Sequence, residues 1–461
     1  MKIVLCNPEV SLRYSHSRKG MYPPLGILAI ATFLERKLKN DIEIEVIDGD
    51  VEEIRDERFK GADLVGFHVN SFNYGNCIEL AQKAKEYGAK VVFGGPHASV
   101  LWRNIMMNRS FVDFIVIEEG EMTMTLLIKK LENNLIDEFE EIPNLVYRNK
   151  NGVPKKANKN YVNTKNDLIT PSREFVDIEK YIDNYRKIYT KDQVSFDRPA
   201  SIYSSKGCTW RDKSGGCIFC ARLDKGVRFR NIKQIWEEIR DLSKLYEIDY
   251  IWDISDDNLN SPEWFKSFVN QKPDELNNIS FLIYSRVNRI SDDIISYLRK
   301  LNVYEVYLGF ESGDNQILKQ SFKGANIDIA IGAAERLKRA GIFYFPSFVL
   351  GLPGETEKSL SNTLKFAERL AKIGSIYRMS ATILMPIPGS KVFQSLLENK
   401  EFGEVLSKKD LISIKELEKL WIDHYTNIDY ATAKKYQKLI SEVIIDKFPA
   451  EIFGLNIENE C

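Results

Sequence analysis

The sequence reads SKGCTWRDKSGGCIFC from Ser205 to Cys220, and three cysteines, Cys208, Cys217 and Cys220, fall within it. Three clustered thiols are an odd number, which fits an iron–sulfur cluster better than a set of disulfides. A [4Fe–4S] cube held by three thiolates leaves one iron open to a ligand that is not protein. The alternative is structural zinc, which takes four ligands, and no fourth Cys or His lies near the stretch. The stretch therefore predicts a cluster with one open coordination position.

Length and composition indicate a globular enzyme of several domains. The chain has 461 residues, of which 44% are hydrophobic and 28% are charged, and such a length corresponds to roughly three domains. The 65 basic and 66 acidic residues give a net charge of −1, which does not favour a nucleic-acid partner. No apolar run reaches the ~18–20 residues of a membrane span. Because the cysteines are either clustered or scattered, we expect a reducing, cytoplasmic location and no membrane partner.

The cysteine stretch follows the first of six predicted strands that alternate with helices. These strands are Ser201–Ser204, Tyr250–Ile254, Ser280–Ser285, Glu305–Gly309, Tyr344–Leu350 and Arg378–Thr382. The helices between them are predicted at Ile232–Leu245, Pro262–Gln271, Asp292–Leu301, Ile327–Ala340 and Glu357–Ile373. Six βα repeats are too few for a closed eight-stranded barrel, so we expect a partial (β/α)6 barrel over residues 200–395, with its site at the carboxyl ends of the strands. Residues 396–461 are expected to form a small helical region.

The first part of the chain has a second alternating pattern. Its predicted strands are Lys2–Cys6, Ile42–Asp48, Leu64–His68, Lys90–Phe93 and Phe114–Ile117, with helices at Leu25–Lys39 and Cys77–Tyr87. Strands that alternate with helices predict a parallel, doubly wound (Rossmann-like) α/β domain over residues 1–140, whose ligand would lie at the strand carboxyl ends. Residues 141–199 are expected to be a linker, with a hairpin turn at Asn149–Gly152.

The cysteine stretch and the strand ends after it resemble the radical S-adenosylmethionine (SAM) enzymes. The resemblance implies that Cys208, Cys217 and Cys220 hold a [4Fe–4S] cluster, that SAM binds the open iron, and that reductive cleavage yields a 5′-deoxyadenosyl radical. The positions that match the SAM-binding positions of the family are Phe219, Asp256, Asp257, Arg286, Glu311, Gly351 and Gly354. The alternatives are that Phe219 only packs and that the two aspartates cap the next helix.

The cysteine spacing departs from the pattern of the family. Most members place three residues between the first two cysteines, whereas eight separate Cys208 from Cys217 here. The additional residues must bulge before the chain returns to the cluster. This departure leaves the subfamily open and makes the added loop a candidate for substrate contact. The substrate candidates are Trp210, Arg211 and Tyr284, although the aromatic ones are equally suited to a core.

The first domain resembles the cobalamin-binding domain that one branch of radical SAM enzymes carries. The matching positions, at which the resemblance implies contact with cobalamin, are Pro24, Leu25, Asn70, Ser71, Phe72, Gly94, Gly95, His97, Glu119, Gly120 and Glu121. The Asp-x-His-x-x-Gly signature, whose histidine binds cobalt, is absent. We therefore expect no histidine ligation of this type, and we expect His68 to be a packed strand residue. The alternative is a domain that binds nothing or that shapes a substrate pocket.

The two resemblances together imply an enzyme that uses a [4Fe–4S] cluster, SAM and cobalamin to methylate an unactivated carbon of a small molecule or natural product. Such an enzyme needs an electron donor such as flavodoxin or ferredoxin. Two other interpretations remain open. One is a radical SAM cyclase, dehydratase or rearrangement enzyme, with or without cobalamin. The other is a non-enzymatic carrier of the cluster or of cobalamin, which would not need the ordered SAM-type strand ends.

Overall fold

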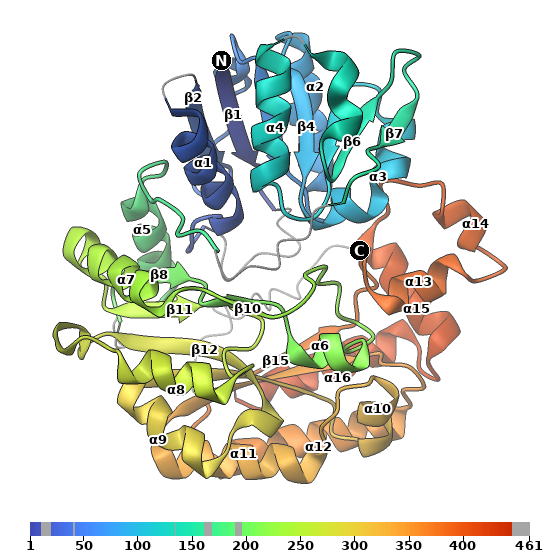
Figure 1. Ribbon diagram of the computed structural model, residues 1–461. Helices are drawn as coiled ribbons and strands as arrows, with labels where there is room; N and C mark the ends of the chain where they lie inside the picture. The colour runs from blue at the N-terminus through green and yellow to red at the C-terminus, as the bar shows by residue number, and fades with distance from the viewer. Residues whose placement is uncertain (11–19, 40–41, 134, 161–167, 190–195, 445–461) are drawn as a thin grey trace.

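The computed structural model describes residues 1–10, 20–39, 42–133, 135–160, 168–189 and 196–444. Figure 1 shows two α/β units, one above the other, with the helices that follow the second sheet lying beside both. This arrangement confirms the fold class expected from the sequence, a doubly wound domain followed by a partial barrel and a helical C-terminal region. No described helix is long and apolar enough to cross a membrane.

The first unit is a seven-stranded sheet in the order β2-β1-β3-β4-β5-β6-β7. Its strands are β1 (Lys2–Asn7), β2 (Glu43–Asp48), β3 (Leu64–His68), β4 (Lys90–Gly94), β5 (Phe114–Val116), β6 (Leu145–Arg148) and β7 (Pro154–Lys156). The first five strands are parallel, and β6 and β7 add an antiparallel hairpin at one edge. The predicted turn at Asn149–Gly152 connects this hairpin, so part of the expected linker belongs to the first sheet.

Helices cover both faces of the first sheet. They are α1 (Leu25–Leu38), α2 (Tyr74–Glu86), α3 (Pro96–Asn108) and α4 (Glu121–Glu132), with short 3-10 turns η3 (Asp56–Phe59) and η4 (Ile136–Glu141). Because side chains alternate along a strand, Ile3 and Leu5 of β1 pack toward α1 and α4, whereas Val4 and Cys6 pack toward α2 and α3. Helices α3 and α4 begin directly after the turns at Gly95 and Gly120 and were not predicted from the sequence.

The second unit is a six-stranded, fully parallel sheet in the order β15-β14-β13-β12-β11-β8. Its strands are β8 (Pro199–Ile202), β11 (Tyr250–Asp253), β12 (Ser280–Arg286), β13 (Val303–Glu311), β14 (Phe343–Leu350) and β15 (Ser380–Ile383). Its helices and turns are α5 (Ile178–Ile188), α7 (Ile232–Tyr246), α8 (Pro262–Asn270), η5 (Asp274–Leu276), η6 (Val287–Arg289), α9 (Asp292–Leu301), α10 (Asn315–Gln320), α11 (Ile327–Ala340) and α12 (Glu357–Ile373). Ile251 faces the outer helices, whereas Tyr250 and Trp252 face an aromatic cluster on the inner side.

A small hairpin and a short helix frame the cysteine stretch. Strand β9 (Ser205–Lys206) begins the stretch and pairs in antiparallel fashion with β10 (Arg228–Phe229), which follows it. The long gap between the first two cysteines forms α6 (Thr209–Ser214), and Gly215 and Gly216 end this helix with φ angles of 74° and 75°. Left-handed backbone of this kind favours glycine, so the gap is an ordered turn of helix.

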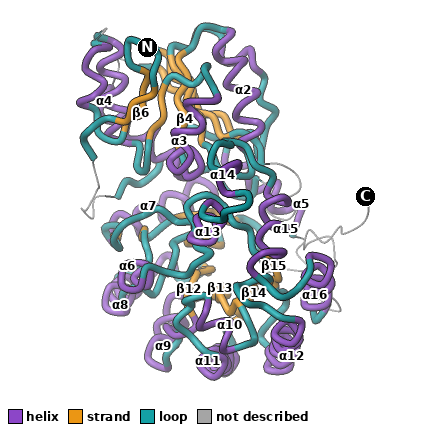
Figure 2. The backbone as a smooth tube through the Cα atoms, turned by 90° about the vertical axis from the view of Figure 1, so that its right-hand side faces the viewer, coloured by secondary structure: helices purple, strands orange, loops and turns teal. Residues whose placement is uncertain are grey.

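The C-terminal region contacts both units. It contains α13 (Lys391–Leu397), α14 (Gly403–Leu406), α15 (Ile414–Tyr425) and α16 (Tyr430–Glu442), and Figure 2 shows this region from the side. Phe393, Leu396, Leu406 and Trp421 belong to the same apolar core as α2 and α3 of the first unit. The C-terminal region is therefore part of the core that joins the units. Residues 445–461 of the expected helical region lie outside the described residues.

Candidate functional site

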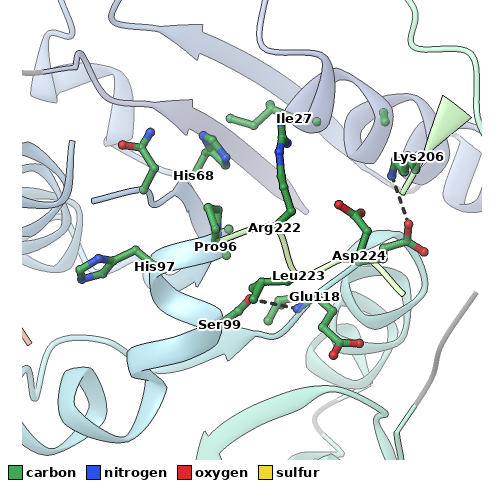
Figure 3. A pocket seen from close by; sticks show the side chains of 18 of the residues that line it. Ile27, His68, Pro96, His97, Ser99, Glu118, Lys206, Arg222, Leu223 and Asp224 are labelled. Atoms are coloured by element: carbon green, nitrogen blue, oxygen red, sulfur yellow. Dashed lines mark hydrogen bonds and ion pairs between the residues drawn. The ribbon is translucent and has the colours of Figure 1, made fainter. Parts of the chain in front are cut away.

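A cavity of about 860 Å³ lies where the carboxyl ends of the first sheet face the cysteine stretch. Figure 3 shows His68 and Pro96 of the first unit together with Arg222, Leu223 and Asp224, which directly follow the cysteine stretch and also line the cavity. Ligands of parallel α/β sheets bind at the carboxyl ends of the strands, and here two such sheets contribute to one space. The cavity is therefore the candidate site.

The first unit supplies a wall of glycine, apolar and polar residues, with glutamates at one rim. Most of the residues expected to contact cobalamin line it, namely Leu25, Asn70, Ser71, Phe72, Gly94, Gly95, His97, Glu119, Gly120 and Glu121, whereas Pro24 caps α1 and is not among the lining residues. Gly95 has a φ of 102°, and a Cβ there would lie 2.6 Å from the Val69 carbonyl oxygen. Only glycine fits such a position without strain.

His97 is held on both of its ring nitrogens. Its Nε2 lies 3.0 Å from the carbonyl oxygen of Asp410, and its Nδ1 lies 3.0 Å from Ser71 Oγ. Because a carbonyl accepts only, Nε2 donates and Nδ1 accepts the Ser71 hydroxyl proton. Burial lowers the pKa of His97 to about 4, so the ring is neutral. Figure 3 shows the ring turned away from the cavity, which makes His97 a link to the C-terminal region.

Ion pairs join the two units along one rim of the cavity. The Glu119 carboxylate lies 2.6 Å from an Arg228 nitrogen and 3.2 Å from Lys206 Nζ, and Glu118 lies 3.2 Å from Lys225 Nζ. Burial would raise the pKa of Glu119, but Arg228 and Lys206 hold this pKa below its ordinary value. Lys206 and Arg228 were not predicted from the sequence, because their partner Glu119 lies about a hundred positions away in the chain.

The three cysteines of the stretch are unpaired and half-buried. Cys220 lines the cavity, and its Sγ lies 3.8 Å from a guanidinium nitrogen of Arg211. Burial raises the pKa of the Cys217 thiol, against the nearby charges of Lys323 and Arg286. No three His, Cys, Asp or Glu side chains of the described ranges converge closely enough to hold a single ion. A [4Fe–4S] cube binds its cysteines through different irons, so the thiols need not meet at one point.

A buried ion pair lies beside Cys217. Lys323 Nζ is 2.6 Å from Glu311 Oε1, and both side chains are 8% exposed. Burial opposes the charge of Lys323, but the attraction of Glu311 and Cys217 leaves the pKa of Lys323 raised. Arg286 donates to the carbonyl oxygen of Lys323. The structure therefore brings Arg286 and Glu311 together, through a lysine that the sequence analysis did not select.

The two adjacent aspartates of the second unit have different environments. Asp256 lines the cavity and pairs with Arg211 at 3.2 Å and with Arg222 at 3.2 Å. Asp257 is fully buried, its Oδ1 accepts from the backbone N–H of Leu259, and burial raises its pKa to about 6. Asp257 Oδ2 has no hydrogen-bond partner in the described part of the chain. Asp256 is thus the aspartate that faces the cavity.

The segment from Gly351 to Glu355 is stabilised by hydrogen bonds between its own residues and by a hydrogen bond from Trp421 of the C-terminal region. Glu355 Oε2 accepts from the backbone N–H groups of Gly351 at 3.0 Å and Leu352 at 3.3 Å. The Trp421 indole donates to the Gly351 carbonyl at 2.7 Å. Burial raises the pKa of Glu355 to about 7. Gly351 and Gly354 both have positive φ, and neither is among the residues that line the cavity.

Family models match both units. The model described as the radical SAM superfamily matches residues 202–367, and the model described as the B12 binding domain matches residues 14–128. The chain is a radical SAM protein with a B12-binding domain. The resemblance of both halves is thereby confirmed. The B12-binding match covers the parallel strands β2 to β5 of the first sheet, the radical SAM match begins at the end of β8 in the second sheet, and the hairpin β6–β7 lies between the two matches.

Three relatives span most of this radical SAM chain. An uncharacterized methyltransferase of Pyrococcus horikoshii is 24% identical, over 96% of this chain and 92% of its own. The solved structure of the methyltransferase TsrM from Kitasatospora setae, with tryptophan substrate and a SAM analogue bound, has a TM-score of 0.67 and 18% identity, over 86% of this chain and 76% of that one. The cobalamin-dependent SAM radical enzyme OxsB, with aqua-cobalamin and SAM bound, has a TM-score of 0.65 and 18% identity, over 98% of this chain and 63% of that one. These likenesses support the fold of both units.

The residues proposed for substrate contact lie in three places of the radical SAM unit. Arg211 bridges Cys220 and Asp256 beside the cavity. Trp210 packs on Gly324, where a Cβ would lie 2.3 Å from the indole ring, and donates to the Phe322 carbonyl. Tyr284 lies on the inner side of the partial barrel. The centroid of its ring is 6.0 Å from that of Trp252 and 5.0 Å from that of Tyr307. The structure thus separates these candidates.

The residues present fit the groups that both domain types bind. Three unpaired thiols with cationic neighbours suit an iron–sulfur cluster. Polar atoms near them that are buried and without a hydrogen-bond partner among the described residues suit a polar ligand such as SAM, namely Arg286 Nε, Asp257 Oδ2, Arg289 Nε and Ser205 Oγ. The glycine-lined wall and the cavity of about 860 Å³ suit a large, flat ligand.

Proposed function

We propose that this chain is a cobalamin-dependent radical SAM methyltransferase that acts on an unactivated carbon of a small molecule. The observation that carries the proposal is the shared cavity, in which the strand ends of the B12-binding unit face the cysteine stretch of the radical SAM unit. When bound, the cluster and SAM supply a 5′-deoxyadenosyl radical, and cobalamin supplies a methyl group. The shared cavity lets both reagents meet one substrate.

The proposal assigns roles to residues of each wall. Cys208, Cys217 and Cys220 would hold the cluster, and Arg211 would orient Cys220 while it pairs with Asp256. The Lys323–Glu311 pair keeps a neutral, hydrogen-bonded environment next to Cys217. Desolvated charges of this kind interact strongly because the local dielectric constant is low.

SAM would be held by the second unit. Phe219 and Asp256 line the cavity next to Cys220. Arg286 and Asp257 lie deeper, with buried polar atoms that lack hydrogen bonds among the described residues, and Asp257 Oδ2 lies 3.9 Å from Arg289 Nε. A zwitterionic ligand satisfies donors and acceptors of both kinds. The glycine-rich segment at Gly351 would contribute shape through its backbone.

The proposed reaction sets requirements on the surroundings of the protein. Reduction of the cluster needs an electron donor such as flavodoxin or ferredoxin. A cluster with an open iron and five free cysteines in the described part of the chain needs a reducing compartment, such as the cytoplasm.

The experiment is anaerobic reconstitution with iron, sulfide and cobalamin, followed by reduction and addition of SAM. We expect both S-adenosylhomocysteine, from methylation of the cobalamin, and 5′-deoxyadenosine, from radical cleavage, in a chromatographic assay. Cys217→Ala should lose iron and at least 100-fold of the 5′-deoxyadenosine formation. The matched control is Cys77→Ala, a buried cysteine on α2 far from the stretch in sequence, which should retain both products.

The products also separate this function from its alternatives. If 5′-deoxyadenosine forms without S-adenosylhomocysteine, methyl transfer is wrong and a cyclase, dehydratase or rearrangement enzyme takes its place. If the reduced protein leaves SAM intact, the enzymatic proposal is overturned and a carrier of the cluster or of cobalamin is the remaining function.

A further inference from the structure

His68 is a cavity residue, contrary to the expectation that it packs inside the sheet. It is the last residue of β3, and its side chain lines the cavity on the wall of the first unit. The ring packs against Gly95, where a Cβ would lie 3.0 Å from the ring carbon Cδ2 of His68. The glycine therefore leaves room for the imidazole at this point of the wall.

A chain of hydrogen bonds behind the ring fixes its tautomer. Asp48 is buried, and its carboxylate accepts from Asn7 Nδ2 at 2.8 Å and from the Tyr181 hydroxyl at 2.7 Å. Because the amide nitrogen of Asn7 faces the carboxylate, the amide oxygen Oδ1 faces His68 Nδ1 at 3.1 Å. An amide oxygen accepts only, so His68 Nδ1 carries the proton.

The other ring nitrogen is left with a lone pair. His68 Nε2 has no hydrogen-bond partner among the described residues, and burial lowers the pKa of the ring, which favours the neutral form. A neutral imidazole whose Nδ1–H is held by an oxygen and whose Nε2 is free has the arrangement of a histidine that binds a metal. His97 lacks this arrangement, because both of its nitrogens are occupied.

We propose that His68 Nε2 is an axial ligand of the cobalt of cobalamin, supplied by the wall opposite the cysteine stretch. The inference rests on the proposed function, since it needs cobalamin in the cavity. The Nε2 lone pair forms the cobalt–nitrogen bond, and the water or the nucleotide base that held this position leaves with its own electron pair. No electron is transferred in this exchange. Asn7 and Asp48 act as positioning residues, because they hold the imidazole in the tautomer that can bind.

The test is electron paramagnetic resonance of the protein loaded with cobalamin and reduced to the cobalt(II) state. An axial nitrogen splits the cobalt lines, as a triplet for nitrogen-14 and as a doublet for nitrogen-15. We expect a triplet from unlabelled protein and a doublet from protein grown on nitrogen-15 with unlabelled cobalamin. A triplet from the labelled protein would mean that the cofactor's own base is the ligand, and absence of splitting would mean that no nitrogen binds. Either result overturns the inference.

Variants of the two histidines give a second readout. His68→Ala in labelled protein should lose the doublet, whereas the matched control His97→Asn should keep it, because His97 Nε2 is committed to Asp410. A doublet that survives in His68→Ala would overturn the assignment to this residue. Equilibrium dialysis separates the two levels of the argument: a protein that takes up no cobalamin overturns the proposed function together with the inference, whereas bound cobalamin without a protein nitrogen overturns the inference alone.

Discussion

The carboxyl edges of the two sheets face each other but are built from different chemistry. The edge of the first unit is lined mainly by glycines, apolar side chains and neutral histidines, and Gly95 has a positive φ there. Its charges, Glu118 and Glu119, lie at the rim and pair with cations of the second unit. The edge of the second unit carries buried charges, in pairs such as Lys323–Glu311 and Arg211–Asp256. Ligand binding at the first edge would depend mainly on the shape of the wall, which suits a large flat ligand such as cobalamin. Ligand binding at the second edge would depend on the balance of buried charges, which suits a small zwitterion such as SAM. The difference shows that the carboxyl edge of a parallel sheet can present either kind of wall, depending on the side chains at the strand ends.

Breaking a charge pair at the second edge should have the largest effect. Lys323→Met leaves the Glu311 carboxylate buried beside Cys217 without its partner, which should lower the free energy of unfolding by about 3–5 kcal/mol. Anaerobic urea denaturation measures the change. The double variant Lys323→Met/Glu311→Gln removes the charge and should recover most of the loss. As a control, Lys225→Ala removes an ion pair whose lysine is 65% exposed and should cost less than about 1 kcal/mol. A single variant as stable as the control would contradict the role assigned to buried charge.

A pH effect of intermediate size should come from Glu355, also at the second edge. Burial raises the pKa of its carboxyl from 4.5 to about 7, so the folded protein keeps a proton that the unfolded chain releases. The contribution of this group to stability is complete below pH 4.5 and is lost as the pH rises through 7. The size is on the order of 3 kcal/mol.

Glu355→Gln keeps the hydrogen bonds to Gly351 and Leu352 without the titration. The variant should therefore be more stable than the parent at pH 8 and similar to it at pH 5, as measured by urea denaturation across this range. If the free energy of unfolding changes with pH by the same amount in both proteins, the Glu355 carboxyl is already ionised in the folded state across this range.

The smallest effect should come from backbone shape at the first edge. Gly95→Ala forces a side chain onto a φ of 102° and onto the Val69 carbonyl, which should cost about 1–3 kcal/mol and weaken cobalamin uptake. Gly94→Ala is the matched control, because its φ is not positive and a Cβ there has its nearest neighbour at 3.9 Å. Thermal unfolding and equilibrium dialysis check both variants. If the two alanines behave alike, shape at Gly95 does not define this wall.

Local patterns in the sequence predicted the parallel strands of both sheets, and several elements have the expected ends. The strand Leu64–His68 and the helices Ile327–Ala340 and Glu357–Ile373 agree residue for residue with the structure. The strand is marked by its apolar run, and the helices are marked by apolar spacing, an N-cap and a C-terminal glycine. The hairpin strands Leu145–Arg148 and Pro154–Lys156 were not predicted, since both are short and the second is polar. Helix α3 was hidden by its start at Pro96, directly after the glycines that had been interpreted as a ligand loop.

The partners within the candidate site could not be predicted in the same way. The pairing of Lys323 with Glu311, and of Glu119 with Arg228, is made by the fold and leaves no local signal. The orientation of His68 depends on Asn7 and Asp48, which come from two other strands. The SAM and cobalamin residues chosen from the sequence remain predictions, now with positions in or near one cavity.

The C-terminal region has a consequence for the order in which the molecule is assembled. Asp410 pairs with Arg109 and accepts from Tyr74 in the first unit, and Trp421 binds the Gly351 carbonyl in the second. A ribosome makes these residues after both walls of the cavity are complete, and domains fold in the order of their synthesis. The contacts of Asp410 and Trp421 that connect the two units therefore form after the units themselves. In a nascent chain, the two walls of the cavity are made before the C-terminal region fixes their relative position.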